Sequence, residues 1–152
     1  KVTQSPKSEF ASFDNGSEMS APKTAGTVTV EGKTNSSKLT FAWSGSVVDV
    51  TLPAKYNANG TQTNNAATIS GDPGATAEFP FSIELEFPKN DTIEEVVRTL
   101  KVTANGGQAA QIAIKQAAGD ATLSVSPTEI TIPQSGAAVS VNVASNTSWT
   151  AA

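Results

Sequence analysis

Residues 79–87 read Phe-Pro-Phe-Ser-Ile-Glu-Leu-Glu-Phe, the longest alternation of apolar and polar side chains in the sequence. Side chains in a β-strand alternate between its two faces, so the odd positions are predicted to face a core, while Ser82, Glu84 and Glu86 face water. Shorter alternating stretches occur at residues 27–30, 39–43, 48–52, 100–102 and 112–114. About seven short strands separated by polar turns predict an all-β protein, an antiparallel β-sandwich.

Turn-forming residues divide these stretches. Asn105-Gly106-Gly107 separates the last two, and it predicts a hairpin because Asn and Gly both tolerate positive φ. Pro80 cannot donate a ladder hydrogen bond, so its end of the strand is predicted to be an edge or a bulge. Residues 55–65 lack a period and are rich in Asn, which predicts the longest loop. Asp72-Pro73-Gly74 predicts a further turn.

The composition agrees with a β fold and excludes much chemistry. Among the 152 residues Val outnumbers Leu 13 to 5, which favours sheets over helices. The chain has no cysteine and no histidine, so disulfides, thiol nucleophiles, histidine-dependent triads and histidine metal sites are excluded. No metal or cofactor is expected. A net charge of −4 without a dense basic patch argues against nucleic acid, and no apolar run is long enough to span a membrane.

An internal repeat appears when the sequence is compared with itself at an offset of 111 residues. The matched positions are 18 with 129, 28 with 139, 30 with 141, and 35–37 with 146–148. A repeat of this length is a whole domain. We therefore interpret residues 1–9 as a flexible N-terminal tether, 10–119 as a complete sandwich, and 120–152 as the first strands of an incomplete second unit.

The incomplete unit is expected to be only marginally stable by itself. Residues 121–152 are predicted to be disordered, to pack on the first unit, or to add to a sheet edge, in this chain or in another. The sequence contains no recognisable signal peptide, so it reads as a mature fragment from which a targeting segment has been removed.

Both ends of the repeat resemble a known family. Residues 123–133 read Leu-Ser-Val-Ser-Pro-Thr-Glu-Ile-Thr-Ile-Pro, and Val-Ser-Val-Asn-Val follows at 139–143 and Asn-Thr-Ser-Trp at 146–149. This stretch resembles the opening of a BACON domain, the Bacteroidetes-associated carbohydrate-binding often N-terminal family. Residues 102–118 are similar to the final hairpin of that family. The opening of the first unit departs from the pattern, since Lys38 occupies the position of the tryptophan at 149.

The resemblance implies an immunoglobulin-like sandwich in exported, multidomain proteins. The expected location is the cell surface or periplasm, with a lipid anchor carried by a removed N-terminal segment. The implied partners are glycans or mucin-type glycoproteins and neighbouring domains of a larger surface protein. The expected function is therefore a non-catalytic glycan-binding module. Some family members look like spacers, so a structural stalk with no ligand is the alternative. An enzyme is least favoured, because no set of residues indicates a reaction.

Sugar binding requires an exposed aromatic face together with hydrogen-bonding amides. Residues 55–65 contain the best such mixture, and the alternative is a hydrophilic loop without a ligand. The candidate ligand-binding residues are Tyr56, Asn57, Asn59, Asn64 and Asn65. Trp43 ends an alternating strand, so a core position is favoured over a ligand platform. Trp149 is expected to be exposed if the second unit is incomplete.

Acidic residues give further candidates, each with a simpler alternative. Glu84 and Glu86 have the spacing of glycosidase carboxylates, but a solvated sheet face without a cleft is favoured. The three carboxylates within residues 91–95 do not follow the order of a calcium loop, so a solvated turn is favoured. Asp-Thr-Ile at 91–93 resembles the acceptor motif for O-glycosylation of exported proteins in the phylum that the family name implies, which predicts a glycan on Thr92.

Overall fold

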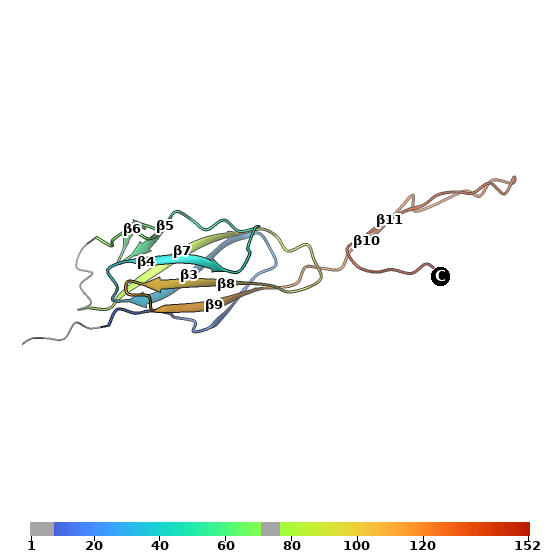
Figure 1. Ribbon diagram of the computed structural model, residues 1–152. Coiled ribbons are helices and arrows are strands. Elements are labelled where there is room, and N and C mark those ends of the chain that lie inside the picture. The colour runs from blue at the N-terminus through green and yellow to red at the C-terminus, as the bar shows by residue number, and fades with distance from the viewer. Residues whose placement is uncertain (1–7, 71–76) are drawn as a thin grey trace, which may run out of the picture.

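Two β-sheets packed against each other form the first unit (Figure 1). The computed structural model describes residues 8–70 and 77–152, and no helix occurs within those ranges. One sheet has the strand order β1-β3-β7-β5-β6 and the other β2-β9-β8-β4, while β10 and β11 form a separate pair. The strands are β1 (Ala11–Phe13), β2 (Glu18–Ala21), β3 (Gly26–Thr34), β4 (Leu39–Ser44), β5 (Lys55–Ala58), β6 (Thr61–Asn64), β7 (Phe79–Phe87), β8 (Val96–Ala104), β9 (Ala109–Gln116), β10 (Leu123–Ser126) and β11 (Asn142–Ser145).

The strand pairs are antiparallel with one exception. β1 pairs with β3 in the five-stranded sheet, whereas β2 pairs in parallel with β9 in the other, so the chain changes sheets between β1 and β2. The predicted all-β, immunoglobulin-like sandwich is confirmed, and this parallel pair was not foreseen. Within the described ranges, nothing resembles a membrane-crossing helix in both length and apolar character.

The alternation at residues 79–87 is present along β7. Its five apolar side chains are each 8% exposed or less, and the side chains at 84 and 86 face solvent. The prediction of an edge or bulge at Pro80 is wrong, because β7 lies inside its sheet and pairs with β3 over all nine residues. Pro80 is tolerated because it lies just past the last residue pair between β5 and β7, so its nitrogen faces the end of β5 and no ladder hydrogen bond is lost. Its carbonyl accepts the amide of Asn59 at 2.8 Å.

The hairpin predicted at residues 105–107 is confirmed between β8 and β9. Gly106 and Gly107 have φ of 94° and 92°, which glycine adopts without strain. The amide of Ala104 donates to the carbonyl of Gln108 at 2.7 Å and closes the turn. The stretches 27–30, 39–43, 100–102 and 112–114 are also strands, in β3, β4, β8 and β9 respectively.

Residues 55–65 form a hairpin, β5–β6, rather than the predicted loop. Asn59 and Gly60 make its two-residue turn with φ of 50° and 77°. Asn-Gly is a strong hairpin signal. The strands beside it were missed because most of their residues are polar, although Tyr56, Ala58 and Thr63 face inward and are buried.

Residues 48–52 are irregular rather than the predicted strand. Val50 is buried, whereas Val48 is 93% exposed, although a strand would place both on the same face. The segment therefore contributes one valine to the core without pairing with a strand. Asp49 between them pairs with Arg98 of β8, and this ion pair holds the segment against the four-stranded sheet. The predicted turn at residues 72–74 and most of the predicted tether lie outside the described residues.

A hydrogen-bonded corner ties the beginning of the first unit to the end of β3. The side-chain carbonyl of Asn35 accepts the amide of Phe10 at 2.8 Å, and its amide donates to the carbonyl of Ser8 at 3.0 Å. The Thr34 hydroxyl donates to the carbonyl of Phe10 at 2.6 Å. Asn35 is fully buried, so these bonds satisfy an amide that has no access to water.

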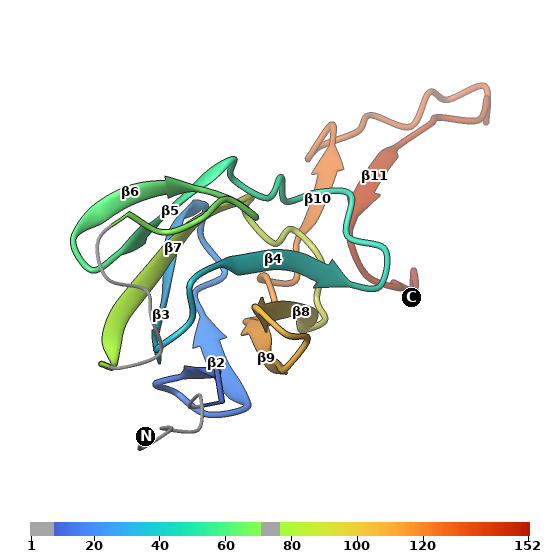
Figure 2. The same cartoon turned by 60° about the vertical axis from the view of Figure 1, so that its left-hand side comes forward.

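The second unit, β10–β11, extends away from the sandwich (Figure 2). Its side chains repeat this hydrogen-bonded corner. Asn146 accepts the amide of Thr122 at 2.8 Å and donates to the carbonyl of Asp120 at 2.8 Å. The Ser145 hydroxyl donates to the carbonyl of Thr122 at 2.7 Å. Asn146 matches Asn35 at the offset of 111, while Thr122 matches Phe10 at 112, so the second unit is one residue shorter between these strands.

Candidate functional site

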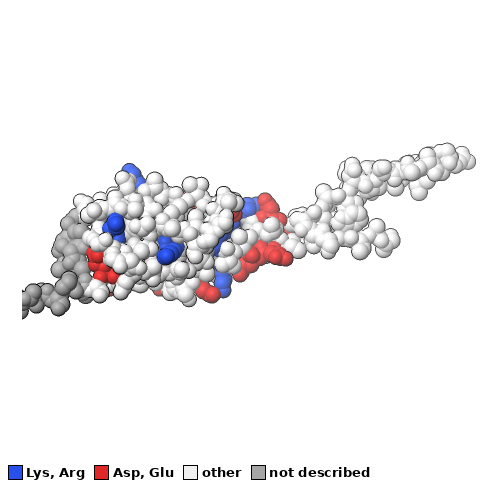
Figure 3. Space-filling model, in the orientation of Figure 1, with Lys and Arg blue, Asp and Glu red and all other residues white. Residues whose placement is uncertain are grey.

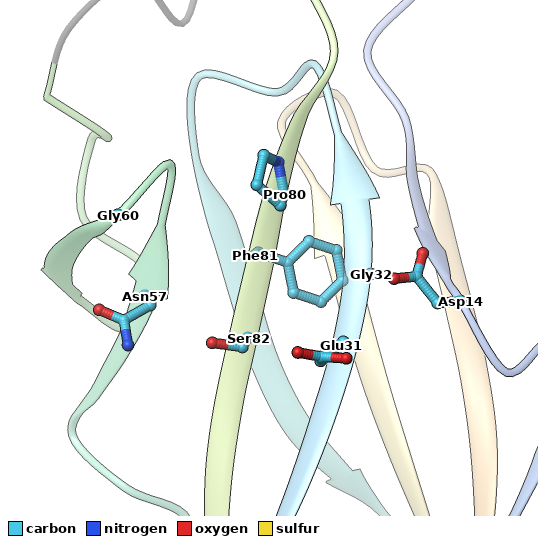
Figure 4. A pocket seen from close by; sticks show the side chains of 8 residues that line it. All are labelled: Asp14, Glu31, Gly32, Asn57, Gly60, Pro80, Phe81 and Ser82. Carbon is cyan, nitrogen blue, oxygen red and sulfur yellow. The ribbon is translucent and has the colours of Figure 1, made fainter.

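Five polar side chains cross the outer face of the five-stranded sheet, and we call them the polar row. Figure 4 shows four of them, Asp14, Glu31, Asn57 and Ser82. Strand register places Asn57 of β5 beside Ser82 of β7, and Ser82 beside Glu31 of β3. Gln62 of β6 lies opposite Asn57, and Asp14, just after β1, donates its backbone amide to the carbonyl of Glu31 at 3.0 Å. These positions all lie on the outward side of the sheet.

A shallow cavity of about 330 Å³ lies along the polar row. Its lining includes four members of the row, Pro80 and two glycines, and it contains no Lys or Arg. The four lining side chains of the row make no hydrogen bond to any other described group. Carboxylate oxygens, an amide and a hydroxyl in one shallow cavity suit a ligand that carries many hydroxyl groups.

Tyr56, predicted to supply the aromatic face for a sugar, lies in the core instead. Its side chain is 3% exposed and packs against Phe41, with ring centroids 4.9 Å apart. Burial raises the pKa of Tyr56 to about 12, although the nearby backbone of Leu39 acts in the opposite direction. The hydroxyl has no partner in hydrogen-bonding geometry among the described residues. The prediction of Tyr56 as a sugar platform is therefore wrong, because its place in β5 faces inward.

The four candidate asparagines occupy four different places. Asn57 belongs to the polar row and lines its cavity, Asn59 forms the turn between β5 and β6, and Asn64 is exposed at the end of β6. Asn65 closes the free edge of β4, where its side chain accepts the amide of Phe41 at 2.8 Å and donates to the carbonyl of Phe41 at 2.9 Å. The structure does not bring the five predicted residues together, and only Asn57 lies in the cavity.

Replacing Asn65 by Asp is expected to lower the free energy of unfolding by about 1–2 kcal/mol. The acceptor for the amide of Phe41 is retained, but the donor to its carbonyl is lost and a carboxylate faces that carbonyl. Urea unfolding should show a lower midpoint with an unchanged slope. Asn64→Asp, on the exposed neighbour, is the matched control and should change this free energy by less than about 0.5 kcal/mol. Equal effects of the two substitutions would contradict the assigned role of Asn65.

The two tryptophans lie far apart in the fold. Trp43 is half-buried against the core, as expected for its strand, and its indole nitrogen donates to the carbonyl of Val50 at 3.0 Å. Trp149 is 50% exposed in the second unit, also as expected. It is the one exposed aromatic side chain among residues 8–70 and 77–152, so no aromatic cluster forms a ligand platform there.

The acidic candidates lie on open surfaces. Glu84 and Glu86 are exposed on the outer face of β7, and Glu86 accepts a hydrogen bond from the Thr27 hydroxyl at 2.6 Å. Residues 91–95 form an exposed turn before β8. In the described part of the chain, no three or more acidic side chains are grouped in a way that could hold a metal ion.

Thr92, the predicted O-glycosylation site, is exposed in the loop between β7 and β8. Its hydroxyl lies 2.7 Å from the side-chain carbonyl of Asn90 and 3.2 Å from the carbonyl of Glu94, and one of these accepts its proton. Asn90 organises the loop, because its buried side-chain amide donates to the carbonyls of Glu94 at 2.8 Å and Ala117 at 3.0 Å. Modification of Thr92 stays a prediction.

The junction between the two units begins at Gly119, which is packed under the loop at residues 90–92. The amide of Gly119 donates to the carbonyl of Thr92 at 2.6 Å. A side chain at this position would overlap the carbonyl of Asn90 and lie 2.8 Å from the carbonyl oxygen of Thr92. Sequence reasoning identified Gly119 only as the end of the first unit, because a glycine between two units is equally typical of a flexible linker and of a tightly packed position.

Asn146 makes a second connection across the junction. Besides the carbonyl of Asp120, its side-chain amide reaches the carbonyl of Asp91 in the first unit at 3.0 Å. Lys23 forms an exposed ion pair with Asp120 and holds the pKa of that carboxyl below its ordinary value. Sequence reasoning did not predict a role for Asn146, although its match to Asn35 in the repeat is a signal that could have identified it.

Comparison of the chain with protein-family models and with curated proteins finds no match.

Proposed function

We propose that this chain is a non-catalytic structural spacer, a β-sandwich module that holds neighbouring domains at a fixed orientation. The junction carries this proposal, because Gly119 is packed against the loop at 90–92 and Asn146 bonds to backbone groups of both units. A flexible linker is rich in Gly and Ser and needs no such contacts. The hydrogen bond from Asn146 to Asp91 forms only when the two units lie in one particular relation.

Two further observations support a spacer over a ligand-binding module. Among the described residues there is no cluster of exposed aromatic side chains. The same side-chain corner is built at Asn35 and at Asn146, as expected of units that follow one another in tandem. Sequence resemblance to BACON domains adds the proposed setting: an exported surface or periplasmic protein, lipid-anchored through a preceding segment.

Spin labels on the two units provide the test. The chain has no native cysteine, so cysteines introduced at the exposed positions Glu84 and Thr128 can be labelled alone. Electron–electron resonance is expected to give one narrow distance distribution, which Asn146→Ala broadens because the bond to Asp91 is lost. Asn142→Ala is the matched control, since Asn142 is exposed and its side chain makes no hydrogen bond among the described residues. A broad distribution in the otherwise unaltered chain would contradict the spacer.

Glycan binding is the second candidate, and the polar row favours it. The row offers hydrogen-bonding groups to a hydroxyl-rich chain lying across the strands, with the cavity at its centre. Calorimetry against mucin-type glycans should then show binding that Asn57→Ala removes and Asn64→Ala leaves unchanged. No heat of binding at millimolar glycan would leave the spacer as the function.

A further inference from the structure

The chain enters and leaves the first unit at opposite ends of the sandwich. At the entry end, the buried side chain of Asn35 bonds to the backbone of Ser8 and Phe10, next to the last residue of β3. At the exit end, the buried side chain of Asn90 bonds to the carbonyl of Ala117, shortly after the last residue of β7. β3 and β7 are antiparallel over nine residue pairs, so these ends lie about 27 Å apart at about 3.4 Å a residue. A pull on the two flanking segments is therefore directed along the strands.

β2 and β9, the second strand of the unit and its last, are parallel neighbours that pair over four residues. Two hydrogen bonds flank this ladder: the amide of Ala113 donates to the carbonyl of Ser17 at 2.8 Å, and the amide of Ala117 donates to the carbonyl of Ala21 at 3.0 Å. Tension pulls β2 from its first residue and β9 from its last. Because the strands are parallel, it slides one along the other and loads all the hydrogen bonds between them at once.

Side chains fasten the exit end of β9 to the rest of the sandwich. Gln116, its last residue, is fully buried; it accepts from Arg98 of β8 at 3.0 Å and donates to the carbonyl of Pro88 at 2.7 Å. Acidic and basic side chains gather at this end of the sandwich (Figure 3). One ion pair joins the two parallel strands directly, with Nζ of Lys115 2.8 Å from a carboxylate oxygen of Glu18. Force applied at the exit is therefore shared with β2, β8 and the end of β7.

We propose that the first unit is a tension-resistant module, and that sliding of β2 along β9 is the step that limits its mechanical unfolding. The proposal extends the spacer function, on which it rests for the direction of the load. The two can fail separately, because the spacer depends on the junction and resistance to tension depends on strands within the first unit. A broad spin-label distribution together with a high unfolding force would contradict the spacer alone.

Single-molecule force measurements on the intact chain test the proposal. The chain has no native cysteine, so handles can be attached through cysteines introduced at the exposed positions Ser8 and Ala121, which pull along the natural path. A second pair at Lys55 and Asn64, exposed partners at the open end of the β5–β6 hairpin, peels two strands apart bond by bond. The force at which the structure first yields is expected to be severalfold higher along the natural path, since forced unfolding reports the unfolding rate.

Two proline substitutions in β2 provide a matched pair. The carbonyl of Ala21 faces β9, and the amide of the same residue points to the same side, so Ala21→Pro removes a hydrogen bond between the two strands. The amide of the preceding residue, Ser20, faces away from β9, so Ser20→Pro restricts the backbone equally and keeps the ladder. Ala21→Pro should remove most of the difference in force between the two paths, whereas Ser20→Pro should keep it. Neither should change the force between residues 55 and 64.

Either of two results would overturn the proposal. A force along the natural path no higher than the peeling force would mean that β2 and β9 do not resist tension. Equal effects of the two proline substitutions along the natural path would place the resisting step elsewhere. Urea unfolding shows whether each variant is folded, and the comparison of the two paths without a proline substitution decides the matter if Ala21→Pro is not.

Discussion

Replacing Gly32 by Val is expected to prevent stable folding of the sandwich. Gly32 lies in β3 opposite Phe81 of β7, and a side chain there would overlap both the carbonyl of Ser12 and the tip of the Phe81 ring. Cε1 of that ring would lie 2.7 Å from the added Cβ. Ser12 is paired with Lys33 in the β1–β3 ladder, and the ring packs edge-on against Phe13 and Phe41, so neither can retreat freely.

Gly32→Ala gives the measurable version of this prediction, with an expected loss of about 3 kcal/mol in the free energy of unfolding. Gly107→Ala is the comparison, because Gly107 has open space around it and a φ of 92°. That substitution strains only the backbone, because alanine is disfavoured at positive φ, and should lose about 1–2 kcal/mol. Adding Phe81→Leu to Gly32→Ala should recover part of the loss. Equal losses at the two glycines in chemical denaturation would contradict the steric account.

The strands that sequence predicts best are those whose pattern and burial agree. In β7 every odd residue is large and apolar, so alternation alone identifies both the strand and its inner face. In β5 and β6 the inward residues include Ala58 and Thr63, which are small, so a buried hairpin looks like a polar loop. Residues 48–52 show the opposite error. Their valines alternate with polar residues as in a strand, but the segment pairs with no strand, and Asp49 forms an ion pair with Arg98 instead.

The candidate site was less predictable because it depends on register between distant strands. Asn57, Ser82 and Glu31 become neighbours only when β5, β7 and β3 are aligned, and no local pattern fixes that alignment. The role of Asn65 was equally hard to predict. Its side chain bonds to the backbone amide and carbonyl of Phe41, and these groups are present at almost every position, so no residue type marks the partner. For the junction the sequence does contain a signal, since the repeat matches Asn146 to Asn35, but the repeat alone does not say what either side chain contacts.

Arg98 is the most buried charged side chain among the described residues of the sandwich. Its side chain in β8 is 4% exposed, and its guanidinium donates two hydrogen bonds to the Asp49 carboxylate, one from Nε at 3.1 Å. It also donates to the side-chain carbonyl of Gln116 at 3.0 Å and lies 4.7 Å from the centre of the Phe87 ring. Gln116 extends this hydrogen-bond network, because its side-chain amide donates to the carbonyl of Pro88 at 2.7 Å.

Arg98→Ala is expected to lower the free energy of unfolding by about 3–4 kcal/mol, because it empties a packed site and leaves a buried acceptor on Gln116 without a donor. Arg98→Met keeps the volume against Phe87 and should recover about half of that loss, because it restores the packing while the acceptor on Gln116 stays without a donor. Urea unfolding measures both. If Met and Ala proved equally damaging, packing against Phe87 would not contribute.

The pH dependence of stability separates the charge of this network from its packing. Hydrogen bonds from Arg98 hold the pKa of Asp49 below its ordinary value of 3.8 in the folded protein. The unfolded chain therefore binds a proton first as the pH falls, so the contribution of Asp49 is complete above that value and is lost as the pH drops through the lower, folded pKa. Asp49→Asn should remove this acid-sensitive part, so its loss of stability relative to the unsubstituted protein is larger at neutral pH than near pH ~3. A difference between the two proteins that stays constant across this range would show that the Asp49 carboxylate is not stabilised by Arg98, and that packing alone holds the guanidinium in place.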